Sequence, residues 1–455
     1  MQSKQRLFGT DGIRGTVNLE PMSVDTILRV GRAAACVFRR SNQRRHSIVI
    51  GKDTRLSGYM FETALASGLC SMGLDVILVG PIPTPGIAFL TAAMRCDAGV
   101  VISASHNPYN DNGIKFFGPD GFKLPDSMEE AIEKWVSSET ELNNQRPSAD
   151  QVGKARRLED ASGRYITYLK QNFKREYSLD GLKIVLDCAH GATYKIAPTI
   201  LTELGAWVTT IGAKPNGKNI NLNTGATYPA RLIQKVIETG SSMGIAFDGD
   251  GDRVVFCDEK GRIYDGDDLL GILAQPLREQ GELGSGVVGT VMSNFGLENY
   301  LAQLGISFYR APVGDRYVVE KMKEVGSLFG GEPSGHVVSL YRSTTGDGIL
   351  SALLLLSQLC RVGKPLAHFF GMIERYPQEI RNIAVRERLA FEKMPKVLRS
   401  IAHAEKSLVG MGRVLVRYSG TETKARVMVE GKNEQLVKKW ADEIATAIAS
   451  EIGAS

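Results

Sequence analysis

The stretch DVILVGPIPTPGIAFLTAAMRCDAGVVISASHNP, residues 75–108, decides the fold class of this chain. It predicts a strand over 75–80, an apolar helix over 84–95 and a second strand over 98–103. The preceding residues 47–73 follow the same alternation of strand and helix. Short apolar strands that alternate with helices are typical of a sheet with parallel strands and covering helices. The first third of the chain is therefore predicted to be an α/β domain.

The same alternation returns twice further along the chain. A second set runs from LKIVLD (182–187) to GIAFD (244–248), and a third runs from GVVGTV (286–291) to SLFGGE (327–332). The tail differs, because VLVRYSGTETKARVMVEG alternates by two and is followed by one long helix. We expect the tail to be a separate α+β domain.

These patterns predict three related α/β domains with mixed, largely parallel sheets and a C-terminal α+β domain, arranged around a central cleft. Residues 137–156 are polar and rich in turn formers, so we expect a linker there. The expected domain boundaries are 1–150, 151–255, 256–366 and 367–455.

Composition restricts the class of protein. Of the 455 residues, 43% are hydrophobic and 23% are charged, which is ordinary for a globular protein and excludes disorder. The net charge of +5 is small for this length, so we expect no nucleic-acid partner. The N-terminus lacks the apolar core of a signal peptide, and the apolar segment ILSALLLLSQLC (349–360) is shorter than the ~20 residues of a membrane span. We expect a cytoplasmic protein that does not bind membranes.

Each α/β set ends its last strand in a polar loop that contains glycine or proline. The loops are SASHNP (103–108), DGDGDR (248–253) and GEPSGH (331–336). Ligands of such sheets bind beyond the carboxyl ends of the strands. We therefore expect these loops, together with SGTET (419–423), to converge on one cleft.

DGDGDR places Asp248, Asp250 and Asp252 at alternate positions, so that in an extended stretch their carboxylates share one face. Such oxygen ligands suit Mg²⁺ or Ca²⁺. Without a cation, two unit charges ~4 Å apart repel by about 4 kcal/mol at an effective dielectric constant of 20. An EF-hand is excluded, because Arg253 stands where its loop requires glycine and the flanks are strands. We expect a divalent-cation site, and an exposed acidic turn is the alternative.

SASHNP places a serine beside a histidine. There is no G-x-S-x-G elbow, and in an extended chain the side chains of Ser105 and His106 point apart, so activation of the serine by its neighbour is not expected. Pro108 stiffens the turn by restricting the residue before it. Lys115 is a candidate general acid or base if a low-dielectric, cation-rich site lowers its pKa. Ser103, or a simple polar cap of the strand, is the alternative.

The tail segment RYSGTET combines hydrogen-bond donors with a glycine turn. The donors and the glycine are Arg417, Ser419, Gly420 and Thr421, with Arg426 nearby. Such a cluster suits a phosphate group, and an ordinary β-hairpin is the alternative.

Together these segments resemble the α-D-phosphohexomutase family. Five motifs match in the family's order: FGTDGIRG (8–15), SASHNP with DNGIKFF (103–117), DGDGDR (248–253), GEPSGH (331–336) and SGTE (419–422). Three more match the branch that acts on glucosamine phosphates: TVMSN (290–294), VGDRY (313–317) and TGDG (345–348). The resemblance covers nearly the whole chain and implies the same four domains.

By this resemblance, Ser105 carries a phosphoryl group as a phosphoserine, and one Mg²⁺ ion is bound by Ser105 and the three aspartates. Lys115 and His106 would assist proton transfer, with Arg14 and Arg253 beside the phosphoserine. A phosphoserine brings about −1.5 to −2 charges at neutral pH, so the site requires such cations.

The remaining roles that the resemblance implies concern the substrate. Glu332, Ser334 and His336 would bind the sugar. The phosphate that does not react would be held by Arg417, Ser419, Gly420, Thr421 and Arg426. Four residues depart from the usual pattern of the family: Thr423, Tyr418, His190 and Pro333. None of them is an expected catalytic group, so the motifs support mutase chemistry more firmly than the identity of the sugar.

The resemblance implies a mutase that interconverts glucosamine 6-phosphate and glucosamine 1-phosphate in UDP-N-acetylglucosamine biosynthesis. The reaction would pass through phospho-Ser105 and a sugar 1,6-bisphosphate, which also acts as activator. The expected partner is a small phosphosugar, and homodimerisation stays open. The alternatives are a phosphomannomutase or phosphoglucomutase with the same mechanism, and a non-catalytic phosphosugar-binding protein. Simple binding, however, requires no phosphorylatable serine.

Overall fold

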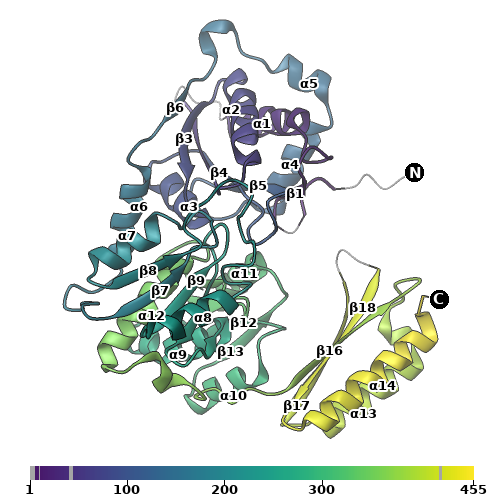
Figure 1. The fold of residues 1–455 in the computed structure, drawn as a ribbon. Coiled ribbons are helices and arrows are strands. Elements are labelled where there is room, and N and C mark those ends of the chain that lie inside the picture. Colours follow the sequence, from purple (N-terminus) through teal and green to yellow (C-terminus); the bar gives the residue numbers. More distant parts are fainter. Residues whose placement is uncertain (1–5, 10, 40–44, 420–422, 455) are drawn as a thin grey trace. The chain divides into compact units, whose positions relative to one another are not determined.

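The computed structural model of the protein describes residues 6–9, 11–39, 45–419 and 423–454. The chain divides into two compact units (Figure 1). Unit 1 comprises Met1–Thr290 and Tyr309–Phe369, and unit 2 comprises Val291–Phe308 and Phe370–Ser455.

The first sheet of unit 1 has six strands in the order β1-β5-β4-β2-β3-β6. Their bounds are Ile13–Thr16 (β1), Ser47–Lys52 (β2), Asp75–Pro81 (β3), Ala98–Ile102 (β4), Asp111–Phe117 (β5) and Ala155–Arg157 (β6). β2 runs parallel to β3 and β4, and β3 runs parallel to β6. β5 is antiparallel to both β4 and β1. The sheet is therefore mixed, with a parallel centre.

The helices of this part of unit 1 pack on the sheet and on one another. They are Val24–Phe38 (α1), Ser57–Ser71 (α2), Thr84–Ala93 (α3), Asp126–Val136 (α4) and Glu139–Asn144 (α5). α1 and α2 lie side by side in Figure 1. Glycine allows this close approach, because a Cβ atom on Gly68 would lie 2.4 Å from the carbonyl oxygen of Leu28.

The expected linker over residues 137–156 is wrong. This segment contains α5, whose Leu142 is fully buried, and a short 3₁₀ helix at Ala149–Gln151 (η1). It ends in β6, which adds an edge strand to the first sheet. All three residues of β6 are exposed, so the sequence carries no apolar signal for this strand.

The second and third sheets of unit 1 have the orders β11-β10-β9-β7-β8 and β13-β12-β14-β15. The strands of the second are Lys183–Asp187 (β7), Trp207–Ile211 (β8), Met243–Phe247 (β9), Val254–Asp258 (β10) and Ile263–Tyr264 (β11). Those of the third are Val287–Thr290 (β12), Phe308–Ala311 (β13), Phe329–Gly331 (β14) and Val337–Ser339 (β15). Their helices are Ala161–Lys170 (α6), Ile196–Glu203 (α7), Ala230–Thr239 (α8), Gly266–Glu279 (α9), Asp315–Val325 (α11) and Gly348–Val362 (α12).

One structural unit is common to the three sheets. In each, a parallel strand is followed by a loop and then by its antiparallel partner: β4 and β5, β9 and β10, β14 and β15. Strands joined by such short loops pair antiparallel, because a parallel pair needs a longer crossover. The mixed, largely parallel α/β architecture predicted from the sequence is confirmed, and the recurring hairpin is an addition to it.

The apolar segment 349–360 lies within α12, where most of its side chains are buried. None of the helices in the described ranges has the length and apolar character needed to cross a membrane. A 3₁₀ helix at Leu366–Phe369 (η2) ends unit 1.

Unit 2 is an α+β structure, as the tail pattern predicts. Its antiparallel sheet has the order β16-β18-β17, with strands Gln378–Ala384 (β16), Gly412–Tyr418 (β17) and Lys424–Gly431 (β18). Its helices are Phe295–Gln303 (α10), Pro395–Ser407 (α13) and Glu434–Ile452 (α14), with a 3₁₀ helix at Phe391–Lys393 (η3). α13 and α14 pack against the sheet through a common apolar core that includes Val427 and Ile444 (Figure 1).

Candidate active site

Three loops of unit 1 meet at one place, and each is the connection inside one of the recurring hairpins. Residues 103–110 follow β4, residues 248–253 follow β9 and residues 332–336 follow β14. The Ser105 hydroxyl donates to Oδ2 of Asp248 at 2.7 Å. The backbone N–H of Val254 donates to the carbonyl oxygen of Gly335 at 3.1 Å. The predicted convergence is therefore correct for these three loops.

Ser105 is buried, with 2% of its surface exposed, and its backbone is in the left-handed region with φ of 52°. The expectation of an extended chain at this point is wrong, because the strand ends at Ile102 and the chain turns at once. Ser103 has a different role: its hydroxyl donates to Asp53 at 2.6 Å and accepts from the backbone N–H of Ser105 at 2.9 Å. This geometry favours Ser105 over Ser103 as the reactive serine.

The three aspartates do not lie in an extended stretch either. The chain turns at Gly251, which has φ of 73°, and this turn brings one carboxylate oxygen of each aspartate within 4.8 Å of the others. Backbone N–H groups of Gly251 and Arg253 donate to Asp248 at 3.1 and 3.2 Å. All three side chains are buried. The turn at Gly251, and not an extended strand, therefore brings the three carboxylates to one side.

The residues at this place fit a metal ion. Oδ1 of Asp250 and Oδ1 of Asp252 are buried and have no hydrogen-bond partner among the described residues. Burial, together with the negative charges of Asp252 and Asp250, raises the pKa of Asp248 well above its usual value. Three buried carboxylates with unused oxygen atoms are a ligand set for a hard divalent cation, which would remove their mutual repulsion.

Lys115 lies among carboxylates rather than among cations. Its Nζ atom is 3.1 Å from Asp11, 3.2 Å from Asp250 and 3.9 Å from Asp252. Burial alone would lower the pKa of this lysine, but the three negative charges outweigh burial and raise it. The expectation of a lowered pKa is wrong, and in this environment Lys115 is an ammonium ion.

Three further candidates surround the serine and the aspartates. Arg14 forms an ion pair with Asp11, and Nε of Arg253 lies 3.8 Å from Oδ1 of Asp252. Burial and the positive charges of Arg253 and Arg14 lower the pKa of His106 to about 4. The imidazole is therefore neutral at pH 7, and its Nδ1 atom is buried without a hydrogen-bond partner in the part of the chain that the structure describes.

The loop after β14 presents Glu332 and Ser334. One carboxylate oxygen of Glu332 accepts from the backbone N–H of Gly314 at 2.8 Å, and the other lies 3.4 Å from the Ser334 hydroxyl. His336 is only 2% exposed, and its two ring nitrogens are each 3.6 Å from a carboxylate, of Asp252 and of Asp315. Burial alone would lower the pKa of His336, but these carboxylates raise it to about 9. The ring therefore lies beside the metal-ligand candidate Asp252, as a cation.

Sequence reasoning missed Asp11, Lys123 and Asp315. Lys123 forms ion pairs with both aspartates, and Asp11 also contacts Lys115. Asp11 and Asp315 stand in the motifs FGTDGIRG and VGDRY, but a single acidic residue in a motif carries no chemical signal of its own. Lys123 stands in none of the motifs.

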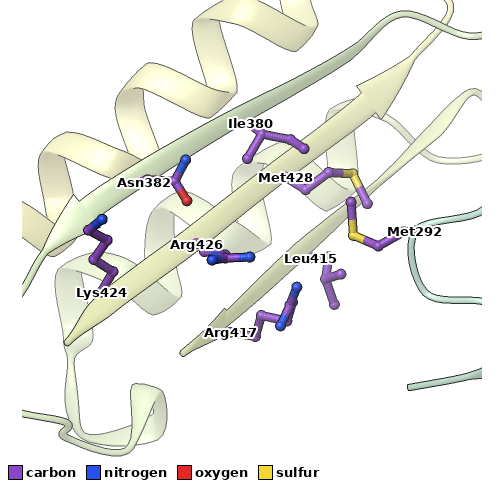
Figure 2. Close-up of a pocket in the computed structure, with 8 residues that line it drawn as sticks. All are labelled: Met292, Ile380, Asn382, Leu415, Arg417, Lys424, Arg426 and Met428. Atoms are coloured by element: carbon purple, nitrogen blue, oxygen red, sulfur yellow. The ribbon is translucent and has the colours of Figure 1, made fainter. Parts of the chain in front are cut away.

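The phosphate-binding candidates of the tail lie in unit 2, on the sheet face opposite α13 and α14. In the strand register, Arg417 pairs with Arg426, and Arg426 pairs with Asn382. Side chains alternate along a strand, so these residues share a face, whereas Val427 lies in the helix-facing core. They line a pocket of about 320 Å³ (Figure 2). The lining residues are Met292, Ile380, Asn382, Leu415, Arg417, Lys424, Arg426 and Met428.

This pocket is strongly basic. Burial and the neighbouring positive charge of Arg426 lower the pKa of Arg417. Three cationic side chains on one small surface suit a dianionic phosphate. Ser419, which directly follows β17, is buried, with 3% of its surface exposed. Gly420 and Thr421 lie outside the described residues.

The structure accounts for two of the unusual residues. Tyr418 points away from the basic pocket, because its ring stacks on Phe391 with centroids 4.6 Å apart and its hydroxyl donates to the carbonyl oxygen of Leu389 at 2.6 Å. His190 has φ of 51°, and its Nδ1 atom accepts from the backbone N–H of Lys214 at 3.2 Å. Both residues have local structural roles.

Family models match four consecutive parts of the chain. Phosphoglucomutase/phosphomannomutase alpha/beta/alpha domains I, II and III match residues 5–143, 163–261 and 265–376. The C-terminal domain of the same family matches residues 380–447.

Individual proteins show the same relationship. A phosphoglucosamine mutase of Syntrophotalea carbinolica is 53% identical over 451 residues, which is 99% of this chain and 98% of that protein. Among solved structures, a phosphoglucomutase/phosphomannomutase family protein from Burkholderia thailandensis superposes with a TM-score of 0.81 at 22% identity, covering 99% of both chains. Aspergillus fumigatus N-acetylphosphoglucosamine mutase, in complex with GlcNAc-6P and magnesium, superposes with a TM-score of 0.65 at 16% identity, covering 98% of this chain and 95% of that one.

Proposed function

The chain belongs to the phosphoglucomutase/phosphomannomutase family and is an isomerase with phosphoglucosamine mutase function, and from this premise we propose that Ser105 carries the phosphoryl group. The observation that carries the proposal is the Ser105 hydroxyl, which is held 2.7 Å from Asp248 within a buried cluster of three aspartates. The reaction interconverts glucosamine 6-phosphate and glucosamine 1-phosphate. The four-domain division at 150, 255 and 366 is part of the same proposal.

In the first step, the free hydroxyl of the sugar phosphate attacks the phosphorus atom of phospho-Ser105. A new bond forms between the sugar oxygen and phosphorus, and the bond from phosphorus to Oγ of Ser105 breaks. The product is a sugar 1,6-bisphosphate, and its other phosphate returns to Ser105 in the second step. Transfer of this kind depends mainly on positioning and on stabilisation of charge.

The charged neighbours of Ser105 have distinct proposed roles. Neutral His106 is the candidate acceptor for the proton of the attacking hydroxyl, and the Lys115 ammonium compensates the charge that develops on Oγ. Arg14 and Arg253 offset the charge of the phosphoserine. A divalent cation, which we propose is Mg²⁺ bound by Asp248, Asp250, Asp252 and the phosphoserine, would neutralise charge on the phosphoryl oxygens.

The substrate is proposed to bind through two groups of residues. Glu332 and Ser334 would hold sugar hydroxyls, with His336 in support, since it is buried beside Asp252. The basic pocket of unit 2 would hold the phosphate that does not react: Arg417, Ser419, Gly420, Thr421 and Arg426. Each phosphate of the bisphosphate must occupy this pocket in turn.

The setting of the reaction is part of the proposal. We propose a cytoplasmic enzyme in the route to UDP-N-acetylglucosamine, activated by a sugar 1,6-bisphosphate. Its partners would be small phosphosugars, with no nucleic acid and no membrane.

Phosphorus NMR tests the proposal. Phosphorylated protein with Mg²⁺ is given glucosamine, mannose or glucose 6-phosphate, and the 1-phosphate product is followed. We expect the amino sugar to react fastest, and faster turnover of mannose or glucose phosphate would contradict the specificity. A lack of turnover with every sugar would favour a phosphosugar-binding protein.

A labelling experiment tests the serine. Incorporation of labelled phosphate from glucosamine 1,6-bisphosphate should be abolished in Ser105→Ala. Ser103→Ala is the matched comparison, because it removes the neighbouring hydroxyl in the same loop. Labelling that persists in Ser105→Ala would show that another residue carries the phosphate.

A further inference from the structure

We propose that Arg55 and Asn221 are positioning residues which hold the backbone carbonyl of Ser105 and thereby direct its hydroxyl toward Asp248. This inference rests on the proposed function of Ser105 as the phosphoryl carrier. Neither residue stands in a motif of the sequence analysis, and neither contacts the aspartate cluster through its own side chain in the hydrogen bonds of the described residues.

Arg55 is the largest fully buried side chain of the described residues, with 0% exposure. Its Nη2 atom donates to the carbonyl oxygens of Ser105 and Asn107, at 2.8 and 2.9 Å. Nη1 donates to the carbonyl oxygens of Asp111, at 3.0 Å, and Pro108. A guanidinium group has five N–H donors in a planar fork. Here three of its hydrogen bonds reach the loop that carries the serine, and one reaches Asp111, the first residue of β5.

The charge of Arg55 is compensated within the same cluster. Its Nε atom donates to Asp53 at 2.8 Å, and Asp53 also accepts from the Ser103 hydroxyl at 2.6 Å. Ser103 in turn accepts from the backbone N–H of Ser105. The N–H and the carbonyl oxygen of Ser105 are therefore both bound to one buried network that starts at β2.

Asn221 approaches the same carbonyl from the second sheet's side of unit 1. Its amide nitrogen donates to the carbonyl oxygens of Ser105 at 2.8 Å and of Asn107 at 3.0 Å. Its own backbone N–H donates to the carbonyl oxygen of Ala189 at 2.8 Å. The two carbonyl groups are thus held in common by Arg55 from one domain and by Asn221 from the next.

The metal loop packs directly against this arrangement. A Cβ atom on Gly249, between Asp248 and Asp250, would lie 2.6 Å from the carbonyl oxygen of Ser105 and 2.7 Å from the amide nitrogen of Asn221. The Ser105 carbonyl is therefore a common contact of Arg55, Asn221 and the loop that carries the aspartates.

The backbone conformation explains why such support is required. Ser105 has φ of 52°, a region that non-glycine residues rarely adopt and that persists where surrounding contacts hold it. Relaxation of this turn would rotate the peptide and move Oγ relative to Asp248. In a transfer reaction, a misplacement of about 1 Å can cost about a hundredfold in rate. We infer that the two donors set the rate of phosphoryl transfer without binding the substrate.

The test uses Asn221→Gly, with Asn223→Gly as the matched control. Both residues have left-handed backbones, with φ of 59° and 51°, so glycine suits either position. Asn223 is exposed, and within the described residues no hydrogen bond joins its side chain to the serine loop. Single-turnover transfer from phospho-Ser105 to glucosamine 6-phosphate is followed in the full-length protein. We expect the rate to fall about ten- to hundredfold in Asn221→Gly, with KM changed less than about twofold. The phosphorus NMR shift of the phosphoserine should also change.

Arg55→Lys is the second variant. It keeps the positive charge beside Asp53 but cannot present the planar fork to the loop, so we expect a loss of transfer rate at least as large as in Asn221→Gly. Equal transfer rates and phosphorus shifts in Asn221→Gly and Asn223→Gly would overturn the positioning role. If wild type and Asn223→Gly also fail to transfer phosphate from Ser105, the proposed function itself fails, and this inference fails with it.

Discussion

The reacting centre of unit 1 and the basic pocket of unit 2 hold charge in opposite ways. Around Ser105, buried acids and bases are interleaved: Lys115 contacts three aspartates, and His336 lies between two. In the basic pocket, Arg417 and Arg426 are cross-strand partners of the same sign. The first site balances its charges within the protein, whereas the second concentrates positive charge that would suit the proposed phosphate.

This contrast has a chemical meaning for a mutase. Phosphoryl transfer requires atoms in fixed positions, and a compensated, buried network supplies them. The phosphate that does not react only has to be gripped, and it must be released when the bisphosphate turns over. Two like charges on an antiparallel sheet would attract such a phosphate.

The largest expected effect is in the reacting centre. Asp250→Asn removes one of three carboxylates and the charge partner of Lys115, so we expect kcat to fall about a thousandfold and binding of Mg²⁺ to weaken. Steady-state kinetics and calorimetric titration with Mg²⁺ measure the two effects. Glu259→Gln, an exposed acid at the far end of β10 from the cluster, is the control and should match wild type. Wild-type Mg²⁺ affinity in Asp250→Asn would contradict the assignment of the metal site.

A smaller effect of a different kind is expected in the basic pocket. Arg417→Met should raise KM for glucosamine 6-phosphate about ten- to hundredfold, because a charge-assisted hydrogen bond to phosphate is lost, while phosphorylation of Ser105 persists. Steady-state kinetics measure KM, and Lys406→Met, on α13 of the same unit, is the control for lost positive charge. If kcat alone fell and KM stayed constant, the assignment of phosphate binding to the basic pocket and of phosphoryl transfer to the reacting centre would be wrong.

The smallest expected effect concerns stability and lies in the scaffold of unit 1. Burial raises the pKa of Glu129 from 4.5 to about 7, although Arg316 is only 3.6 Å away. Because the folded pKa is raised, this carboxyl contributes its full stability below about pH 4.5 and loses it as the pH rises through about 7.

The stability of Glu129→Gln relative to wild type should therefore increase as the pH rises from about 5 to about 8, by on the order of 1–3 kcal/mol, and its melting temperature should rise relative to wild type accordingly. Thermal unfolding at a series of pH values measures this difference. Glu443→Gln, an exposed acid on α14 of unit 2, is the control. A constant difference between Glu129→Gln and wild type over this range would show that burial of Glu129 is compensated.

Much of the architecture was predictable because periodicity reports burial. The strands β3 and β4 and the helix α3 lie within a few residues of their predicted positions, and the tail forms the predicted α+β structure. β6 was missed because all its residues are exposed, and its pairing with β3 depends on partners 79 positions away in the chain, such as Val76 for Ala155. The strands β5 and β15 were missed, and β10 was expected as a strand but not as an antiparallel partner, because pairing direction leaves no local pattern.

The candidate site divides along the same line. The kind of chemistry could be predicted from the residue types and their order: a serine, three aspartates, a lysine and two arginines in these motifs indicate a site for phosphate and a metal ion. Their electrostatics were not readable, and the prediction for Lys115 had the wrong sign. The pKa depends on Asp11, Asp250 and Asp252, which lie far from Lys115 in sequence and meet it only in the fold.

By itself, then, the sequence determined the α/β class, the order of the motifs and the kinds of atoms at the site, because these follow from residue type and local spacing. Only the tertiary structure decided how the side chains of the site are oriented. Ser105 adopts a left-handed turn, and the side chains of Arg55 and Asn221 both donate to its carbonyl oxygen. These residues come from segments that belong to different sheets. Local preference disfavours a positive φ at serine, and long-range hydrogen bonds impose it.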